Sequence, residues 1–210
     1  MTLVADRVTY RRPDGGFVLP PTDLTVRPGR ITALVGPSGC GKTTVAHLLS
    51  GLLVPGSGSV TAGGVDVRRR RGRLPGHTAL LDQDPVSASD PHLTLRRALT
   101  LSASVRGVPV DPDALAVEVG LDPALLDRRP AEVSGGQLQR ACLARALAQE
   151  PRYLIADEAT AHLDPLSTTA IARTLRRRAD GGLGVLAITH DLRLAESWAD
   201  EVVELETHAP

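Results

Sequence analysis

The stretch that decides the fold is Gly36-Pro37-Ser38-Gly39-Cys40-Gly41-Lys42-Thr43-Thr44, a full match to the pattern G-x-x-x-x-G-K-[ST]. An apolar, strand-like run at residues 30–35 precedes it, and residues 44–53 follow it with apolar side chains at helical spacing. In this context glycines let successive backbone N–H groups turn toward a polyphosphate, and the start of the helix adds a positive partial charge. The pattern therefore predicts a phosphate-binding loop between a strand and a helix.

Lys42 is the only lysine among the 24 Lys and Arg residues. Its compact ammonium group suits the β- and γ-phosphates of a nucleotide, where the planar guanidinium of arginine would be a poor replacement. Thr43 offers a hydroxyl group to Mg²⁺. The alternative is a glycine loop that matches by chance, but the flanking strand and helix argue against it.

Composition excludes several other classes of protein. The chain has 210 residues, of which 42 % are apolar and 23 % charged, as in an ordinary globular domain. Its 24 cationic and 24 anionic residues balance, and only 2 % are aromatic, so a basic or base-stacking nucleic-acid surface is disfavoured. The two cysteines form neither a disulfide framework nor a zinc pattern. We expect no signal peptide and no membrane-spanning segment, because no apolar run is long enough.

The pattern along the chain is α/β. Strands are predicted at residues 3–10, 23–26, 30–35, 153–156, 184–189 and 201–205, and strands with turns at residues 55–67. Helices are predicted at residues 44–53, 93–106, 113–119, 136–149 and 165–178, with a last helix ending at 199. We predict one domain over residues 1–210, with a core at about 1–85 and 150–210 and a helical part at about 86–149.

A pair of carboxylates follows the apolar run at residues 153–156. In an enzyme with a phosphate loop, Asp157 at the strand end would hold Mg²⁺ through a water, and Glu158 would polarise the attacking water. Such pairs are also common at strand ends that merely face solvent. Their position after a phosphate loop favours the catalytic interpretation.

The segment Val133-Ser134-Gly135-Gly136-Gln137-Leu138-Gln139-Arg140 precedes that strand. Ser134 can cap a helix here, leaving backbone N–H groups at Gly135 and Gly136 free to meet an anion. The segment resembles the LSGGQ signature of the ABC (ATP-binding cassette) ATPases, with Val133 in place of the usual leucine. Four further matches stand in the order typical of that family: Tyr10 as the aromatic residue that stacks on adenine, Gln83 as the Q-loop glutamine, residues 161–164 ending at Asp164 as the D-loop, and His190 as the switch histidine.

The resemblance implies a RecA-like P-loop core with an N-terminal antiparallel β subdomain and an inserted α-helical subdomain. It also implies that ATP and Mg²⁺ are bound, with Gln83 contributing to Mg²⁺ coordination beside Thr43 and Asp157. His190 would contact the γ-phosphate and orient the water and Glu158, and Asp164 would communicate across a dimer. Phe17 is an alternative to Tyr10 for the adenine contact. The ATP-binding set is then Tyr10, Gly36, Pro37, Ser38, Gly39, Cys40, Gly41, Lys42, Thr43, Thr44 and Gln83.

The same resemblance implies the partners. Cassettes of this family pair head to tail, so Ser134, Gly135, Gly136 and Gln137 would hold the γ-phosphate bound by a second ABC ATPase subunit, identical or not. Transmembrane permease subunits and an extracellular solute-binding protein would complete a transporter, with this chain peripheral on the cytoplasmic face of the membrane. No nucleic-acid partner is expected.

The wording around residues 83–99 and 137–140 is similar to the dipeptide, oligopeptide and nickel importer ATPases. That group usually continues well past the last strand, whereas this sequence ends at Pro210. The alternatives are an exporter or amino-acid-type transporter ATPase and, from another class, a regulatory module that binds nucleotide without hydrolysing it. The arginine run at residues 68–73 is predicted to be a solvated loop, with an anionic partner as the alternative.

Overall fold

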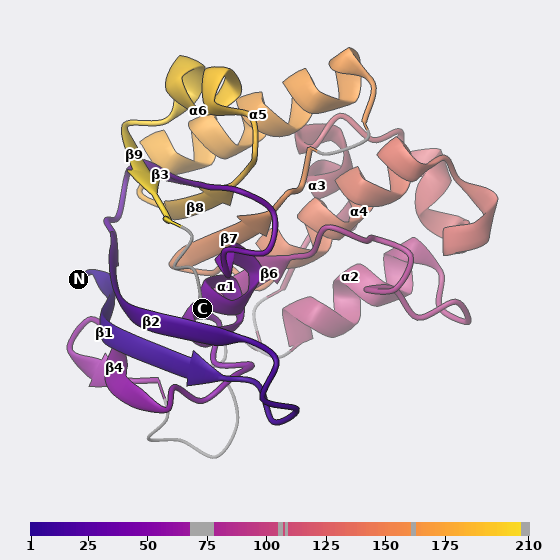
Figure 1. Cartoon of the computed structure of the whole chain (residues 1–210). Coiled ribbons are helices and arrows are strands. Elements are labelled where there is room, and N and C mark those ends of the chain that lie inside the picture. The colour runs from indigo at the N-terminus through magenta and orange to yellow at the C-terminus, as the bar shows by residue number, and fades with distance from the viewer. Residues whose placement is uncertain (68–77, 105–106, 108, 161–162, 207–210) are drawn as a thin grey trace.

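The computed structural model describes residues 1–67, 78–104, 107, 109–160 and 163–206, which form two β-sheets and a set of helices that pack mainly around the parallel one (Figure 1). The arginine run at 68–73 and the D-loop residues 161 and 162 lie outside the described residues. The strands are β1 (Leu3–Arg11), β2 (Val18–Val26), β3 (Ile31–Val35), β4 (Ser57–Ala62), β5 (Val65–Asp66), β6 (Thr78–Leu81), β7 (Tyr153–Asp157), β8 (Gly184–Ile188) and β9 (Glu201–Glu204). The helices are α1 (Lys42–Leu49), α2 (Leu95–Ser104), α3 (Pro112–Glu118), α4 (Gly135–Leu147), α5 (Pro165–Asp180) and α6 (Leu192–Trp198), with 3-10 helices η1 (Pro123–Asp127) and η2 (Pro130–Glu132).

Five strands form a parallel sheet in the order β6-β7-β8-β3-β9. Every residue of β3, β7 and β8 is buried, which is the pattern of a parallel sheet covered on both faces. Because the strands run in one direction, their carboxyl ends meet at one edge, where α/β sheets commonly bind ligands. The fold therefore offers one edge at which several loops can build a site together.

The second sheet is antiparallel, with the order β2-β1-β4-β5. The sequence predicted a strand only over residues 23–26, whereas β2 begins at Val18 and includes Pro20 and Pro21. That prediction was too short because β2 lies at the edge of this sheet, where a proline on the open side breaks no ladder hydrogen bond.

Helix α1 lies between the two sheets (Figure 1). Its Val45, Leu48 and Leu49 are fully buried in one cluster with side chains of β1 and β2 on one side and of β7 and β8 on the other. The predicted helix ran to residue 53, but α1 ends at Leu49. Gly51 takes a left-handed φ of +72°, and the N–H group of Leu52 bonds back to the carbonyl oxygen of His47, which stops the helix.

Helices α5 and α6 cover the opposite face of the parallel sheet (Figure 1). Alternate residues of β8 show the two faces: Leu186 joins the cluster around α1, and Val185 joins the cluster that contains α5. Helices α2, α3 and α4 follow β6 in the chain, and α4 packs against α2, α3, α5 and β6. Helix α4 therefore connects the helical part to the sheet.

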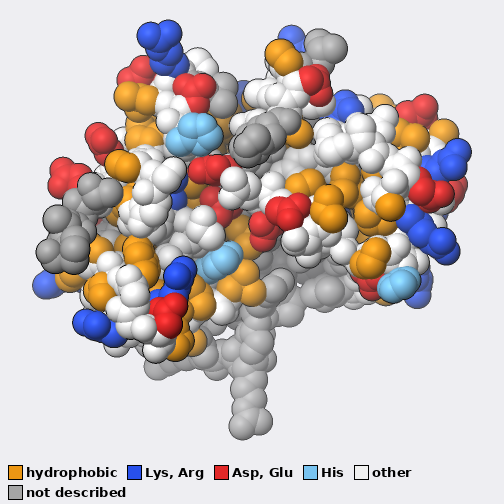
Figure 2. All heavy atoms as spheres, turned by 45° about the vertical axis from the view of Figure 1, so that its right-hand side comes forward, with side chains coloured by type: hydrophobic (Ala, Val, Ile, Leu, Met, Phe, Trp, Pro, Cys, Tyr) orange, Lys and Arg blue, Asp and Glu red, His pale blue; other side chains and the backbone are white. Residues whose placement is uncertain are grey.

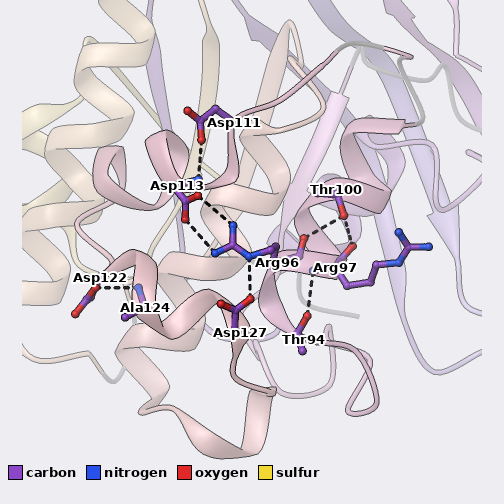
Figure 3. A network of polar contacts seen from close by, with 9 residues as sticks. All are labelled: Thr94, Arg96, Arg97, Thr100, Asp111, Asp113, Asp122, Ala124 and Asp127. Atoms are coloured by element: carbon purple, nitrogen blue, oxygen red, sulfur yellow. Dashed lines mark hydrogen bonds and ion pairs between the residues drawn. The ribbon is translucent and has the colours of Figure 1, made fainter.

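Charged contacts hold the helical part together (Figure 3). Arg96, near the start of α2, donates Nε to Asp127 Oδ1 at 2.8 Å, and its Nη1 and Nη2 atoms bond the carboxylate of Asp113 at 3.2 and 3.1 Å. Asp113 lies in α3 and Asp127 in η1, so one guanidinium joins three elements. Asp111 and Asp122 cap α3 and η1 by accepting bonds from backbone N–H groups.

The surface carries mixed charge. On the face drawn in Figure 2, the described Lys and Arg side chains lie in separate small groups among acidic and apolar side chains. Of the helices in the described ranges, none has the length and apolar character needed to cross a bilayer.

Candidate active site

Four ends of the parallel strands supply the predicted site residues. The glycine-rich loop at 36–41 follows β3, and Glu158 follows β7 directly. His190 comes two residues after β8, and Gln83 two residues after β6. Since these ends share one edge of the sheet, residues spread over more than 150 positions of sequence come together there.

Two glycines of the loop are required by its geometry. Gly36 has φ +156°, and a Cβ atom there would lie 2.5 Å from the carbonyl oxygen of Leu205. Gly41 has φ +110°, and a Cβ atom there would lie 2.8 Å from Cζ of Phe17. Any side chain at either position would collide with its neighbours, so the close turn into α1 depends on glycine.

Lys42 is held at the loop by its own backbone. The side chain is buried, and Nζ donates to the carbonyl oxygens of Gly36 and Pro37 at 2.8 and 2.9 Å. An ammonium group has three N–H donors, so this arrangement leaves one for a further acceptor. Lys42 therefore both braces the loop and presents a positive charge at the start of α1.

A cavity of about 540 Å³ lies over the loop. Its size and its wall of backbone N–H groups, hydroxyls and one ammonium suit a nucleoside triphosphate rather than an apolar ligand. The residues that line it are Arg12, Gly16, Phe17, Ser38, Gly39, Gly41, Lys42, Thr43, Thr44, Gln83 and Glu158. Of the predicted loop residues, Gly36, Pro37 and Cys40 do not line the cavity.

Asp157 lies beside the cavity as a buried carboxylate. Its side chain is 4 % exposed, and Oδ1 has no hydrogen-bond partner among the described residues. Burial raises the pKa of Asp157 above its usual range, and a hydrogen bond with Thr43 acts in the opposite direction. An unsatisfied carboxylate oxygen beside a threonine hydroxyl is an oxygen donor set that suits a hard divalent cation.

Glu158 has an unusual backbone conformation for its residue type. Its φ is +45°, in the left-handed region that non-glycine residues seldom adopt, and its N–H group donates to the carbonyl oxygen of Ile188 at 3.0 Å. This bond to β8 fixes the turn at the end of β7. Strain of this kind is often found where a side chain is aimed at a ligand.

Both carboxylate oxygens of Glu158 face another predicted site residue. Gln83 Nε2 donates to Oε2 at 2.9 Å, and His190 Nδ1 lies 3.6 Å from Oε1. The Glu158 side chain is 19 % exposed, whereas the His190 side chain is 62 % exposed. The structure thus brings Gln83 and His190 to Glu158; Gln83 and Glu158 line the cavity, whereas the exposed His190 reaches it through Glu158.

The signature residues lie apart from that cavity. Ser134 caps α4: its hydroxyl accepts from the N–H group of Gln137 at 3.3 Å, and Gln137 Oε1 accepts from the N–H group of Ser134 at 2.8 Å. Ser134 and Gly135 are exposed, and neither lines the cavity. The start of α4 therefore presents a capped helix end to the outside of this chain.

Asp164 caps the start of α5, next to the signature. It accepts from the N–H group of Ser167 at 3.0 Å and from the Ser167 hydroxyl at 2.6 Å. Gly136 packs against this cap, because a Cβ atom there would lie 2.7 Å from Ser167 Oγ. The structure places the D-loop aspartate and the signature side by side.

Tyr10 does not lie at the cavity. It is in β1, where its side chain packs, partly buried, against the cluster around α1, while Phe17 lines the cavity. Phe17 packs against the same cluster, so the two aromatic residues differ in that Phe17 lines the cavity. Arg12 and Gly16 also line the cavity. Sequence alone indicates only a turn at these residues, because their approach to the loop depends on how β1 and β2 pack over α1.

Known proteins resemble this chain over most of its length. The family model described as ABC transporter matches residues 19–161. The nickel import ATP-binding protein NikE of Shigella dysenteriae serotype 1 (strain Sd197) is 38 % identical, with 98 % of this chain and 84 % of the relative covered. The chain belongs to the ABC transporter family. The NikE protein of Escherichia coli (strain K12) is also 38 % identical, covering 90 % of this chain and 75 % of that protein.

Solved structures confirm the fold of this ABC protein. The dimeric MJ0796 structure, a bacterial ABC transporter cassette, superposes with a TM-score of 0.88 at 23 % identity and covers 99 % of this chain and 95 % of that one. An ATP binding subunit of an ABC transporter gives a TM-score of 0.87 at 26 % identity, covering 100 % and 89 %. The predicted RecA-like core with an antiparallel sheet and an inserted helical part is confirmed, and the chain is an ATP-binding, ATP-hydrolysing subunit of an ABC transporter.

Proposed function

We propose that this ABC ATPase powers the import of nickel ions or small peptides from the cytoplasmic face of a membrane. The observation that carries the proposal is the 38 % identity, over nearly the whole chain, to two nickel import ATP-binding proteins. The resemblance of residues 83–99 and 137–140 to importers of dipeptides, oligopeptides and nickel supports it independently of those names.

The site residues divide the work on ATP. Backbone N–H groups of the 36–41 loop and the Lys42 ammonium bind the β- and γ-phosphates, and Phe17 packs against the base. Glu158 acts as the general base that takes a proton from the attacking water. Gln83 and His190, which already face the two oxygens of Glu158, orient that carboxylate and the water.

Mg²⁺ fits the residues beside the loop. Thr43 supplies a hydroxyl and Asp157 a buried carboxylate with an unsatisfied oxygen, the latter acting through a water, and Gln83 can add its amide oxygen. Such a site, with one carboxylate and the substrate phosphates, is the usual binding mode of Mg²⁺. When bound, the ion neutralises charge that develops on the phosphates.

Asp157→Asn tests the metal site. At neutral pH the variant without nucleotide is expected to melt about 2–4 °C higher than the wild type, because a neutral amide avoids the cost of burying a charge. Since the folded pKa of Asp157 is raised, that cost appears as pH rises from the unfolded pKa through the folded one. The gap in Tm should therefore vanish at low pH and grow toward pH 7.

Thermal melts between pH 4 and pH 7.5, with and without ATP and MgCl₂, measure both effects. Mg²⁺ is expected to add to the ATP-induced rise in Tm for the wild type and to add little for Asp157→Asn. An equal Mg²⁺ increment in both proteins would remove Asp157 from the metal site.

The exposed signature supports a dimer in which each ATP is shared. Ser134, Gly135, Gly136 and Gln137 lie outside the chain's own cavity, and their helix start is free to meet the γ-phosphate held by a second cassette. ATP would then favour the closed dimer through contacts made only in that state, and hydrolysis would release it. Permease subunits, with a solute-binding protein for capture outside the cell, complete the proposed importer.

Two alternatives to the proposed importer can be compared with the site. An exporter or amino-acid-type ATPase would share every site residue named above, since the cassette contacts nucleotide and not cargo. The other alternative, a regulatory module that binds ATP without turnover, does not agree with membership of this ATPase family or with the contacts that Gln83 and His190 make to Glu158.

Uptake measurements in the cells that naturally express this chain identify the transported substrate. Deleting this chain is expected to abolish energy-dependent uptake of ⁶³Ni²⁺ or of a labelled dipeptide, with recovery by the wild-type chain and none by Glu158→Gln. If both uptakes persist and a compound accumulates inside the deleted cells, the chain serves an exporter.

A further inference from the structure

Gln139 is a buried polar residue for which the mechanism above has no role. It is the fifth residue of α4, and its side chain is 2 % exposed. Its Nε2 atom donates to the backbone carbonyl oxygen of Asp82 at 3.1 Å, while Oε1 has no partner in the described part of the chain. An apolar side chain of similar length would fill this position without leaving a buried polar atom unsatisfied. The retained amide therefore points to a use for its one hydrogen bond.

That bond belongs to a row of contacts along one face of α4. Three side chains of α4, spaced three residues apart, contact the segment that follows β6. Cys142 Sγ lies 3.9 Å from the carbonyl oxygen of Pro85, and Arg145 Nη1 donates to the carbonyl oxygen of Ala88 at 2.7 Å. Because α4 is a continuous helix, a shift of its capped start moves the segment after β6 with it.

The segment held in this way contains Gln83. Gln139 bonds the residue just before Gln83, and Gln83 in turn bonds Glu158 Oε2 at 2.9 Å. A chain of two side-chain hydrogen bonds therefore joins the signature helix to the proposed general base inside one subunit. Cys142 and Arg145 hold the segment farther from Gln83, so Gln139 is the contact that bears on it most directly.

We propose that Gln139 is a positioning residue that sets Gln83 against Glu158 according to where the signature end of α4 lies. The inference rests on the proposed role of Glu158 as general base. Through Gln139, the orientation of Glu158 depends on the position of α4, whose start faces the second cassette in the proposed dimer. Hydrolysis then proceeds when the signature at that start is in contact with the second cassette.

Gln139→Met tests this role with little change of shape. The variant fills the same space but cannot donate to Asp82, so the kcat for ATP hydrolysis by the purified chain is expected to fall about tenfold. The Kd for ATP is expected to stay within about twofold, because Gln139 is buried and does not line the cavity, and the Tm is expected to be equal or higher. Gln149→Met, which alters a partly exposed glutamine just beyond α4, is the matched control and should leave all three values unchanged.

A double-variant cycle shows whether Gln139 acts through Gln83. If it does, Gln83→Ala with Gln139→Met hydrolyses ATP no more slowly than Gln83→Ala alone, within about twofold. Multiplying effects would overturn the proposal, as would an unchanged kcat in Gln139→Met or a loss that follows a lower Tm. Glu158→Gln separates this failure from failure of the assigned base: if that variant hydrolyses like wild type, the site itself is wrong.

Discussion

Glu158→Gln is expected to lower the kcat of ATP hydrolysis by about 10²–10⁴-fold. The amide keeps the size of the side chain and one acceptor oxygen, but it cannot take a proton from the attacking water. The Kd for ATP is expected to stay within about twofold, because the phosphates are bound by the loop and Lys42. Steady-state phosphate release and an equilibrium nucleotide titration measure the two quantities. Slow hydrolysis should also trap an ATP-bound dimer, visible by size-exclusion chromatography.

Glu150→Gln is a closely matched control. Glu150 shares the left-handed backbone of Glu158, with φ +44° against +45°, but it is exposed and follows α4. Changing it removes the same charge from the same kind of backbone without touching the cavity, so its kcat should equal that of the wild type. Equal activity in Glu158→Gln and Glu150→Gln would show that the base lies elsewhere.

Motif spacing predicted much of the site because the chemistry needs fixed local geometry. The loop at 36–44 requires glycine where φ is positive and a neighbouring segment comes too close for a Cβ atom. The motif places glycine at two such positions, Gly36 and Gly41, so they could be predicted from the sequence. The position of Glu158 was likewise legible as the residue that ends an apolar strand. Once the strands are parallel, their carboxyl ends meet at one edge, so these separate local signals predicted one site.

Features that depend on packing between distant segments could not be predicted from the sequence. Arg12 and Phe17 reach the cavity only because β1 and β2 fold over α1, whereas Tyr10, which packs against the same cluster as Phe17, does not line it. The bond from Gln139 to Asp82 spans 57 positions and follows no short pattern. The early start of β2 was missed because proline argues against a strand unless the strand is at an edge, which only the sheet order reveals.

Lys42→Ala is expected to weaken ATP binding by about 10²-fold or more, and hydrolysis at fixed ATP falls with it. The variant loses a cation at the phosphates, where each charge-assisted hydrogen bond contributes about 1.5–3 kcal/mol. It also removes both bonds that brace the loop, those to the carbonyl oxygens of Gly36 and Pro37. A nucleotide titration gives the Kd, and a thermal melt without nucleotide separates lost binding from a loosened loop.

Lys42→Arg separates the effect of the positive charge from the effect of the shape of the cationic group. A guanidinium keeps the positive charge, but its planar fork does not suit a site where one small group must reach two carbonyl oxygens and a phosphate at once. The Kd of Lys42→Arg for ATP is therefore expected to be closer to that of Lys42→Ala than to that of the wild type. This is expected even though every other Lys or Arg position of the chain is arginine. Wild-type ATPase activity in Lys42→Ala would contradict the phosphate-loop assignment, whereas wild-type activity in Lys42→Arg alone would show that charge, without compactness, is what the loop requires.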